Sequence, residues 1–182
     1  LGDADVREYI RSVFVPLLRE KTTLRQERIP AGPTQSLTTW KPFQVTHSEY
    51  RPTIKAERTL FNLVPCNRNL EVLFTHFLDI AEDVAAFAKN AGPQALRIDF
   101  QGTGNRHAFY TPDFFARTVD GKMYLIETKG EADQEVGAKA RAAVAWCKSA
   151  SESGVSWEYL FVPEGIFQRF NTNKIELLKG AC

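Results

Sequence analysis

Residues 112–130 read PDFFARTVDGKMYLIETKG, and this stretch constrains the fold more than any other part of the chain. Two runs of strand-forming residues flank Asp120-Gly121, a pair that is typical of tight hairpin turns. The pattern therefore predicts a β-hairpin. Because side chains alternate along a strand, Glu127 and Lys129 share one face of the second strand, and Thr128 lies on the other.

The length of the turn decides which residue of the first strand faces Glu127. With a two-residue loop at Asp120-Gly121, Asp113 lies opposite Thr128, and Glu127 points through the other face. With a three-residue turn in which Gly121 is left-handed, Asp113 lies opposite Glu127, with Cβ atoms about 5 Å apart. A distortion next to Pro112 has the same effect. The sequence permits each of these, and the chemistry of paired carboxylates favours the arrangement that brings them together.

Asp113 and Glu127 have the chemistry of magnesium ligands, because Mg²⁺ prefers one or two carboxylates together with water and phosphate oxygens. Lys129 is suited to orient an attacking water or to stabilise charge that grows on a phosphate. The alternative for the carboxylates is a solvated strand end, and for Lys129 an ion pair with either carboxylate. Mn²⁺ is expected to substitute for Mg²⁺.

Periodicity predicts the remaining elements. Segment 28–65 contains five prolines and predicts short strands and loops, and 102–107 a loop. The final residues predict a short helix and an amphipathic strand. Helices are expected at 3–21, about 70–90 and about 134–150, and strands at 96–101 and 157–163.

The composition narrows the class of protein. The chain has 182 residues, 43% of them apolar, enough for a domain with a substantial core. It has no apolar run of about 18 residues, so no membrane partner is expected. The three cysteines lack metal-site spacing and indicate a reducing compartment. A net charge of +1 argues against strong binding to DNA or RNA by this chain alone. The start at Leu1, without Met, predicts a fragment of a longer protein.

Several segments together resemble a known family. NRNLEVLFTHFLDIAEDVAAFAKN at 67–90 is followed by YTPDFFART, YLIETKGE and KARAAVAWC. These segments and the order helix, strand, strand, strand, helix, strand resemble the PD-(D/E)XK nuclease superfamily. Within it, they look like the C-terminal endonuclease domain of type III restriction enzyme Res subunits, over roughly 50–163. The resemblance implies a mixed α/β fold with a restriction-endonuclease-like core at 67–182. An N-terminal extension, 1–66, with a helix and accessory strands, would pack on that core.

The resemblance also implies roles for further residues. The backbone carbonyl of Thr128 would be a metal ligand, and Glu71 on the first core helix a possible one; the alternative for Glu71 is a solvent-facing helical glutamate. Lys139 heads the apolar stripe of its helix and either reaches a phosphate or extends its charged end to solvent. Arg106 and His107 are candidate DNA contacts, with a merely solvated pair as the alternative.

These observations predict a Mg²⁺-dependent endonuclease domain that cuts duplex DNA, with Asp113, Glu127 and Lys129 as its catalytic residues. By resemblance, the partners are helicase-like, ATP-driven motor domains of the same chain and a methyltransferase/specificity subunit, in the cytoplasm of a prokaryote with a role in phage defence. One alternative is a catalytically silent nucleic-acid-binding or scaffolding module of the same fold. Another is a nuclease for RNA or branched DNA.

Overall fold

A mixed four-stranded sheet forms the centre of the molecule. The computed structural model describes residues 3–21, 36–130 and 134–182. The sheet order is β3-β6-β7-β8, in which β6 is antiparallel to both of its neighbours and β8 is parallel to β7. The strands are β3 (Val84–Lys89), β6 (Phe114–Thr118), β7 (Met123–Lys129) and β8 (Trp157–Pro163).

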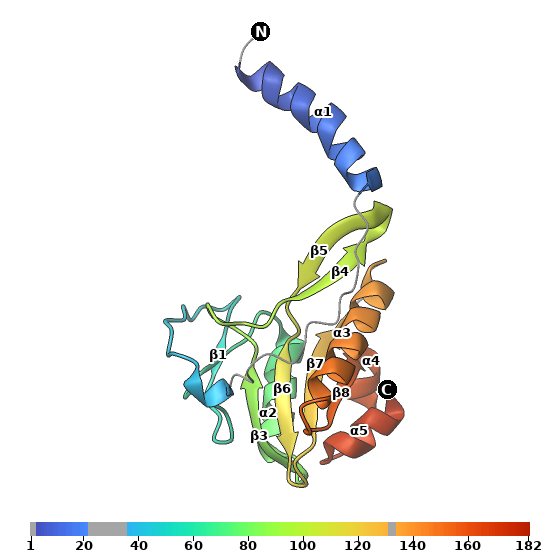
Figure 1. The fold of residues 1–182 in the computed structure, drawn as a ribbon. Coiled ribbons are helices and arrows are strands. Elements are labelled where there is room, and N and C mark those ends of the chain that lie inside the picture. Colours follow the sequence, from blue (N-terminus) through green and yellow to red (C-terminus); the bar gives the residue numbers. More distant parts are fainter. Residues whose placement is uncertain (1–2, 22–35, 131–133) are drawn as a thin grey trace.

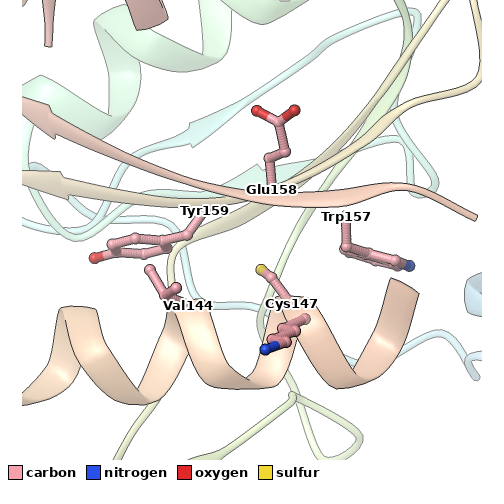
Figure 2. Close-up of a pocket in the computed structure, with 6 residues that line it drawn as sticks. Val144, Cys147, Trp157, Glu158 and Tyr159 are labelled. Carbon is pink, nitrogen blue, oxygen red and sulfur yellow. The ribbon is translucent and has the colours of Figure 1, made fainter. Parts of the chain in front are cut away.

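Helices cover both faces of this sheet (Figure 1). On one face lie α2 (Asn69–Ile80) and α5 (Ile175–Ala181), and on the other lies α3 (Val136–Ser151); α4 (Glu164–Arg169) follows β8. Successive side chains of each strand point to opposite faces of the sheet, as strand geometry requires. Phe114 packs in the core on the α2 side, and Phe115 packs in the core on the α3 side. Figure 2 shows the same alternation in β8, where Trp157 and Tyr159 point toward α3 and Glu158 points away.

Smaller elements extend from this body. A two-stranded ribbon of β4 (Ile98–Gly102) and β5 (Arg106–Tyr110) is joined by the short 3-10 helix η2 (Thr103–Asn105). Figure 1 shows the ribbon projecting from the sheet and α1 (Asp3–Lys21) lying beyond its tip. The other short elements are η1 (Leu37–Thr39), β1 (Thr53–Ile54) and β2 (Val64–Pro65).

The predicted first core helix is too long and needs correction. The sequence predicted a helix to about residue 90, but α2 ends at Ile80 and residues 84–89 form strand β3. Asp83, in the turn between them, accepts hydrogen bonds from the backbone N–H groups of Ile175 (2.8 Å) and Glu176 (3.1 Å) at the start of α5. This tertiary cap and the β3–β6 ladder outweigh the helical spacing of the apolar residues, which include several alanines.

The core elements follow the predicted order helix, strand, strand, strand, helix, strand, but the first strand is a different segment. Segment 96–101, expected in the core sheet, is β4 and pairs with β5 instead. The expected loop at 102–107 contains η2 and the start of β5. The sequence of core elements is therefore α2, β3, β6, β7, α3 and β8, with the ribbon inserted after β3. At the C-terminal end the expected amphipathic strand is wrong, because the segment forms α5.

The helices predicted at 3–21 and 134–150 and the strand at 157–163 are confirmed as α1, α3 and β8. Within the expected extension 1–66, Trp40, Val64 and Cys66 are buried in the two cores. By contrast, α1 exposes its large apolar side chains, Phe14 among them. The short strands expected in 28–65 are present as β1 and β2, while 28–35 lies outside the described residues.

The described residues show the state of the three cysteines and the character of the helices. Cys66 and Cys147 are buried free thiols, and Cys182 is an exposed one. No helix in the described parts of the chain combines the length and apolarity that a membrane span needs.

The hairpin turn adopts the three-residue form. Gly121 has φ of 90°, and the Thr118 N–H donates to the Lys122 carbonyl at 2.9 Å. The ladder runs from Phe114 opposite Ile126 to Arg117 opposite Met123. This is the register that the three-residue turn predicted, and it holds as far as Phe114.

Replacing Gly121 with Ala is expected to lower the free energy of unfolding by about 1 kcal/mol, because an L-residue is strained at this φ. A Cβ at this position meets no atom within 4 Å, so the loss is conformational and not steric. Urea unfolding measures it. Gly180→Ala in α5 is the matched control, since its Cβ also enters open space at an ordinary φ. Equal stability of Gly121→Ala and the parent would contradict the turn assignment.

Candidate functional site

The Asp113 carboxylate ends the β6–β7 ladder by standing in for a main-chain acceptor. Its Oδ2 accepts hydrogen bonds from the Thr128 N–H (2.8 Å) and the Thr128 hydroxyl (2.7 Å). The Asp113 N–H donates to the Ile126 carbonyl at 2.9 Å, one residue short of the regular register. The strand is therefore distorted directly after Pro112, in addition to the three-residue turn. From the sequence, either feature alone was expected to bring Asp113 opposite Glu127, and together their effects on side-chain alternation cancel. The Asp113 carboxylate contacts Thr128 and Lys89, and Thr128 alternates with Glu127 along β7. The expectation that Asp113 and Glu127 share one face of the sheet is therefore wrong.

Glu127 lies on the α3 side and carries a buried oxygen without a partner. Its Oε2 is buried and has no hydrogen-bond partner among the residues that the structure describes. Burial and, next to it, the negative charge of Asp113 together raise the pKa of this carboxyl to about 8, against the opposing effect of Lys129, Lys89 and Lys139. An unsatisfied buried carboxylate is costly, so Glu127 is a group that gains from binding either a proton or a cation.

A lysine that the sequence analysis missed lies at the centre of this region. The Nζ of Lys89, the last residue of β3, is 2.7 Å from Glu71 Oε2 and 3.0 Å from Asp113 Oδ1. Its side chain is 6% exposed, and its Nζ lies 4.4 Å from the centre of the Phe114 ring. Burial works against the charged form, but the carboxylates of Asp113 and Glu71 outweigh it and raise the pKa of Lys89 above its usual value.

Asn90 fixes the backbone around Asp113. Its N–H donates to the Asp113 carbonyl at 2.8 Å, and its side-chain amide donates to the Pro112 carbonyl at 2.8 Å. The same side chain exchanges hydrogen bonds with the backbone of Leu96, at 3.0 and 2.7 Å. Lys89 and Asn90 therefore hold the side chain and the main chain of Asp113 from one strand end. Because the sequence pattern assigned both residues to a helix, neither was expected to be near the site.

Glu71 is turned into this cluster and not toward solvent. It lies in the first turn of α2, is 5% exposed, and its Oε2 also accepts a hydrogen bond from the Asn67 N–H at 3.0 Å. The solvent-facing alternative for Glu71 is therefore wrong. Its partner is the ammonium group of Lys89, which lies between Glu71 and Asp113.

Lys129 and Lys139 both act electrostatically on Glu127, which places them around the same carboxylate. Lys139, on α3, lies with its Nζ 5.8 Å from the centre of the Phe100 ring. The site thus gathers three lysines, Lys89, Lys129 and Lys139, around three carboxylates, Glu71, Asp113 and Glu127.

Arg106 and His107 lie at the start of β5 on the ribbon. Arg106 pairs with Glu135 at 3.3 Å, and His107 pairs with Asp99 at 3.4 Å. Both side chains are half exposed. Each already faces a carboxylate, so any phosphate contact by these residues has to compete with that pair.

The donor set fits a cation bound by Glu127 and Asp113 with few protein ligands. A carboxylate offers about four lone-pair sites, and three donors already use those of Asp113, so about one remains. The described residues contain no group of three or more His, Cys, Asp and Glu side chains that could hold a metal. A hard cation here would complete its shell with water, phosphate oxygens or the Thr128 carbonyl, a manner of binding that suits Mg²⁺.

A separate pocket between α3 and β8 has no comparable chemistry (Figure 2). It is lined by Val144, Cys147, Trp157 and Tyr159 together with Lys148 and Glu158. Burial raises the pKa of the Cys147 thiol to about 12, so the group is a buried hydrophobe and a poor nucleophile. The pocket does not add to the candidate site.

Comparison with known proteins found no matching family model, curated protein or solved structure. The nuclease resemblance therefore stays a prediction that rests on the chain's own residues.

The pKa of Glu127 predicts a pH dependence of stability in metal-free buffer. The folded-state pKa of about 8 lies above the ordinary value of 4.5, so the folded protein binds the extra proton between these limits. The free energy of unfolding should then fall as pH rises from 4.5 to 8, with a slope of at most about 1.4 kcal/mol per pH unit. Urea unfolding across this range measures the slope.

Glu127→Gln removes the titrating group and is expected to make this slope shallower, with a gain in stability near pH 8. Glu57→Gln, on the exposed surface, is the control. An identical pH profile for the parent and Glu127→Gln would contradict the buried, unpartnered state of Glu127.

Proposed function

We propose that this chain is a metal-dependent endonuclease domain that hydrolyses phosphodiester bonds of duplex DNA. The observation that carries the proposal is the buried, unpartnered oxygen of Glu127, with the carboxylate of Asp113 and the ammonium of Lys129 beside it. The arrangement of α2, β3, β6, β7, α3 and β8 supports it, because the Asp113 and Glu127 strands are adjacent and central in the sheet.

Each residue of the site would have a distinct role in hydrolysis. Asp113 and Glu127 would hold Mg²⁺, which when bound supplies charge neutralisation and Lewis acidity at the phosphate. Lys129 would orient the nucleophilic water and offset charge on the phosphate oxygens. Lys139, from α3, acts electrostatically on Glu127 and would contact a neighbouring phosphate. Binding to the motor domains and specificity subunit of a type III restriction enzyme would supply the DNA affinity and position of the cut.

One observation favours a second candidate, the catalytically silent module of the same fold. Lys89 already pairs with both Asp113 and Glu71, and the described residues contain no three-ligand metal group. In such a module the same cluster would serve stability alone. Catalysis separates the two candidates directly.

The parent chain is expected to nick supercoiled plasmid slowly with Mn²⁺, and Asp113→Ala, Glu127→Ala and Lys129→Ala are each expected to abolish this nicking. Each substitution removes a group that contacts the cation or the phosphate, so the loss is expected to exceed about 100-fold. Circular dichroism checks the fold of each variant. Lys55→Ala and Glu57→Ala, both on the exposed surface, are the charge-matched controls. Undiminished nicking by Glu127→Ala would refute the site, and a nicking-inactive parent would favour the silent module.

The chain alone is expected to bind arbitrary duplex DNA weakly, with a Kd above about 1 µM near physiological salt. Its 23 Lys and Arg residues are balanced by 22 Asp and Glu residues, so few cations are available to displace counterions from DNA. A gel-shift titration measures the affinity. Sub-micromolar binding would show that this surface finds DNA without the other domains.

A further inference from the structure

Lys89 occupies the position that a second cation would take at this site. Its Nζ lies 2.7 Å from Glu71 Oε2 and 3.0 Å from Asp113 Oδ1, so one ammonium group bridges two carboxylates from different elements. The side chains of Lys89 and Glu71 are 6% and 7% exposed, and that of Asp113 is 16% exposed. Buried charges persist only when they are paired, and this arrangement pairs all three.

Neighbouring groups hold the three side chains in this arrangement. Glu71 accepts a further hydrogen bond from the Asn67 N–H, which fixes it against the start of α2. Asp113 Oδ2 is bound to Thr128, so its Oδ1 is presented to Lys89. The Lys89 ammonium group lies over the Phe114 ring. The ammonium group is therefore confined and cannot easily leave the two carboxylates.

Glu127 is placed differently. Its Oε2 has no hydrogen-bond partner among the described residues, although the charge of Asp113 acts on it. Of the three carboxylates, only this one has a buried oxygen without a partner in the described parts of the chain. Glu127 is therefore the carboxylate that still lacks a positively charged partner at its buried oxygen. Glu71 already has one, the ammonium group of Lys89.

We propose that Lys89 is the positioning residue of this site, a built-in monovalent cation that holds Asp113 in place. It makes Glu71 its counter-ion and not a metal ligand, so that the site takes one divalent cation, at Asp113 and Glu127. This inference rests on the proposed function for the identity of the site. Glu71, expected from the resemblance to be a possible metal ligand, is instead the counter-ion of Lys89.

The test is calorimetric titration of the 182-residue chain with Mn²⁺ near pH 8. The parent is expected to bind one Mn²⁺ per chain. Asp113→Asn and Glu127→Gln should each weaken the affinity by about tenfold or more, because each removes a ligand charge. Glu71→Gln should change it by about threefold or less, because it acts only through Lys89. A loss with Glu71→Gln as large as that with Asp113→Asn, or two Mn²⁺ on the parent, would overturn the inference.

Lys89→Met tests the ammonium group itself with a side chain of similar length and no charge. Removing the bridge leaves Glu71 and Asp113 facing each other, and this variant should bind a second Mn²⁺ there. Lys122→Met is the matched control, since Lys122 also pairs with a glutamate, Glu176 at 2.8 Å, but at the other end of β7. Stoichiometry of one in both folded variants would contradict the role of Lys89. If Lys89→Met does not fold, the Glu71→Gln comparison decides.

The outcomes separate this inference from the proposed function. Single-site Mn²⁺ binding that is insensitive to Glu71→Gln, without plasmid nicking, would support the role of Lys89 and refute the nuclease. Nicking that Glu71→Gln abolishes together with Mn²⁺ binding would support the nuclease and refute the role of Lys89. Absence of Mn²⁺ binding by the parent would refute both.

Discussion

The ion pairs of Lys89 connect the elements on which the rest of the site depends. Through this one ammonium group, α2 is joined to the end of β3 and to the start of β6. Asp113 continues the connection to β7 by its hydrogen bonds to Thr128. The attraction between charges is strong in a buried setting, and so is the cost of leaving one of them unpaired. The geometry of Asp113 is therefore set by four elements together.

Local signals were sufficient for the hairpin and for several other elements. The Asp-Gly turn with its strand-forming flanks predicted β6 and β7, and the chemistry of paired carboxylates selected the turn in which Gly121 is left-handed. The spacing of apolar residues predicted α1 and α3. These elements are decided by residues close in sequence, and the pattern is then a reliable guide.

Long-range contacts decided the rest. Segment 84–89 has helical apolar spacing, yet it becomes β3 because β6 pairs with it on both sides of one irregularity between Val84 and Ala86, and because Asp83 is engaged with α5. Once β3 was misassigned, Lys89 and Asn90 could not be placed near Asp113. The candidate ligands were thus accessible from sequence, whereas the groups that hold them were not. The orientation of Asp113 followed the same rule, since it depends on Lys89 and on the distortion after Pro112.

The two ends of the β4–β5 ribbon are held together by one side chain, that of Asn90. Asn90 binds the backbone of both Leu96, just before the ribbon, and Pro112, just after it. The chain thus leaves and re-enters the sheet at one fixed point, whatever lies between. Ile98, Phe100 and Tyr110 tie the base of the ribbon to the core on the α3 side, whereas the tip around η2 is not part of that core. Loop-closure entropy grows only slowly with length, so this tip can be lengthened or shortened at small cost while Asp113 and Glu127 keep their positions.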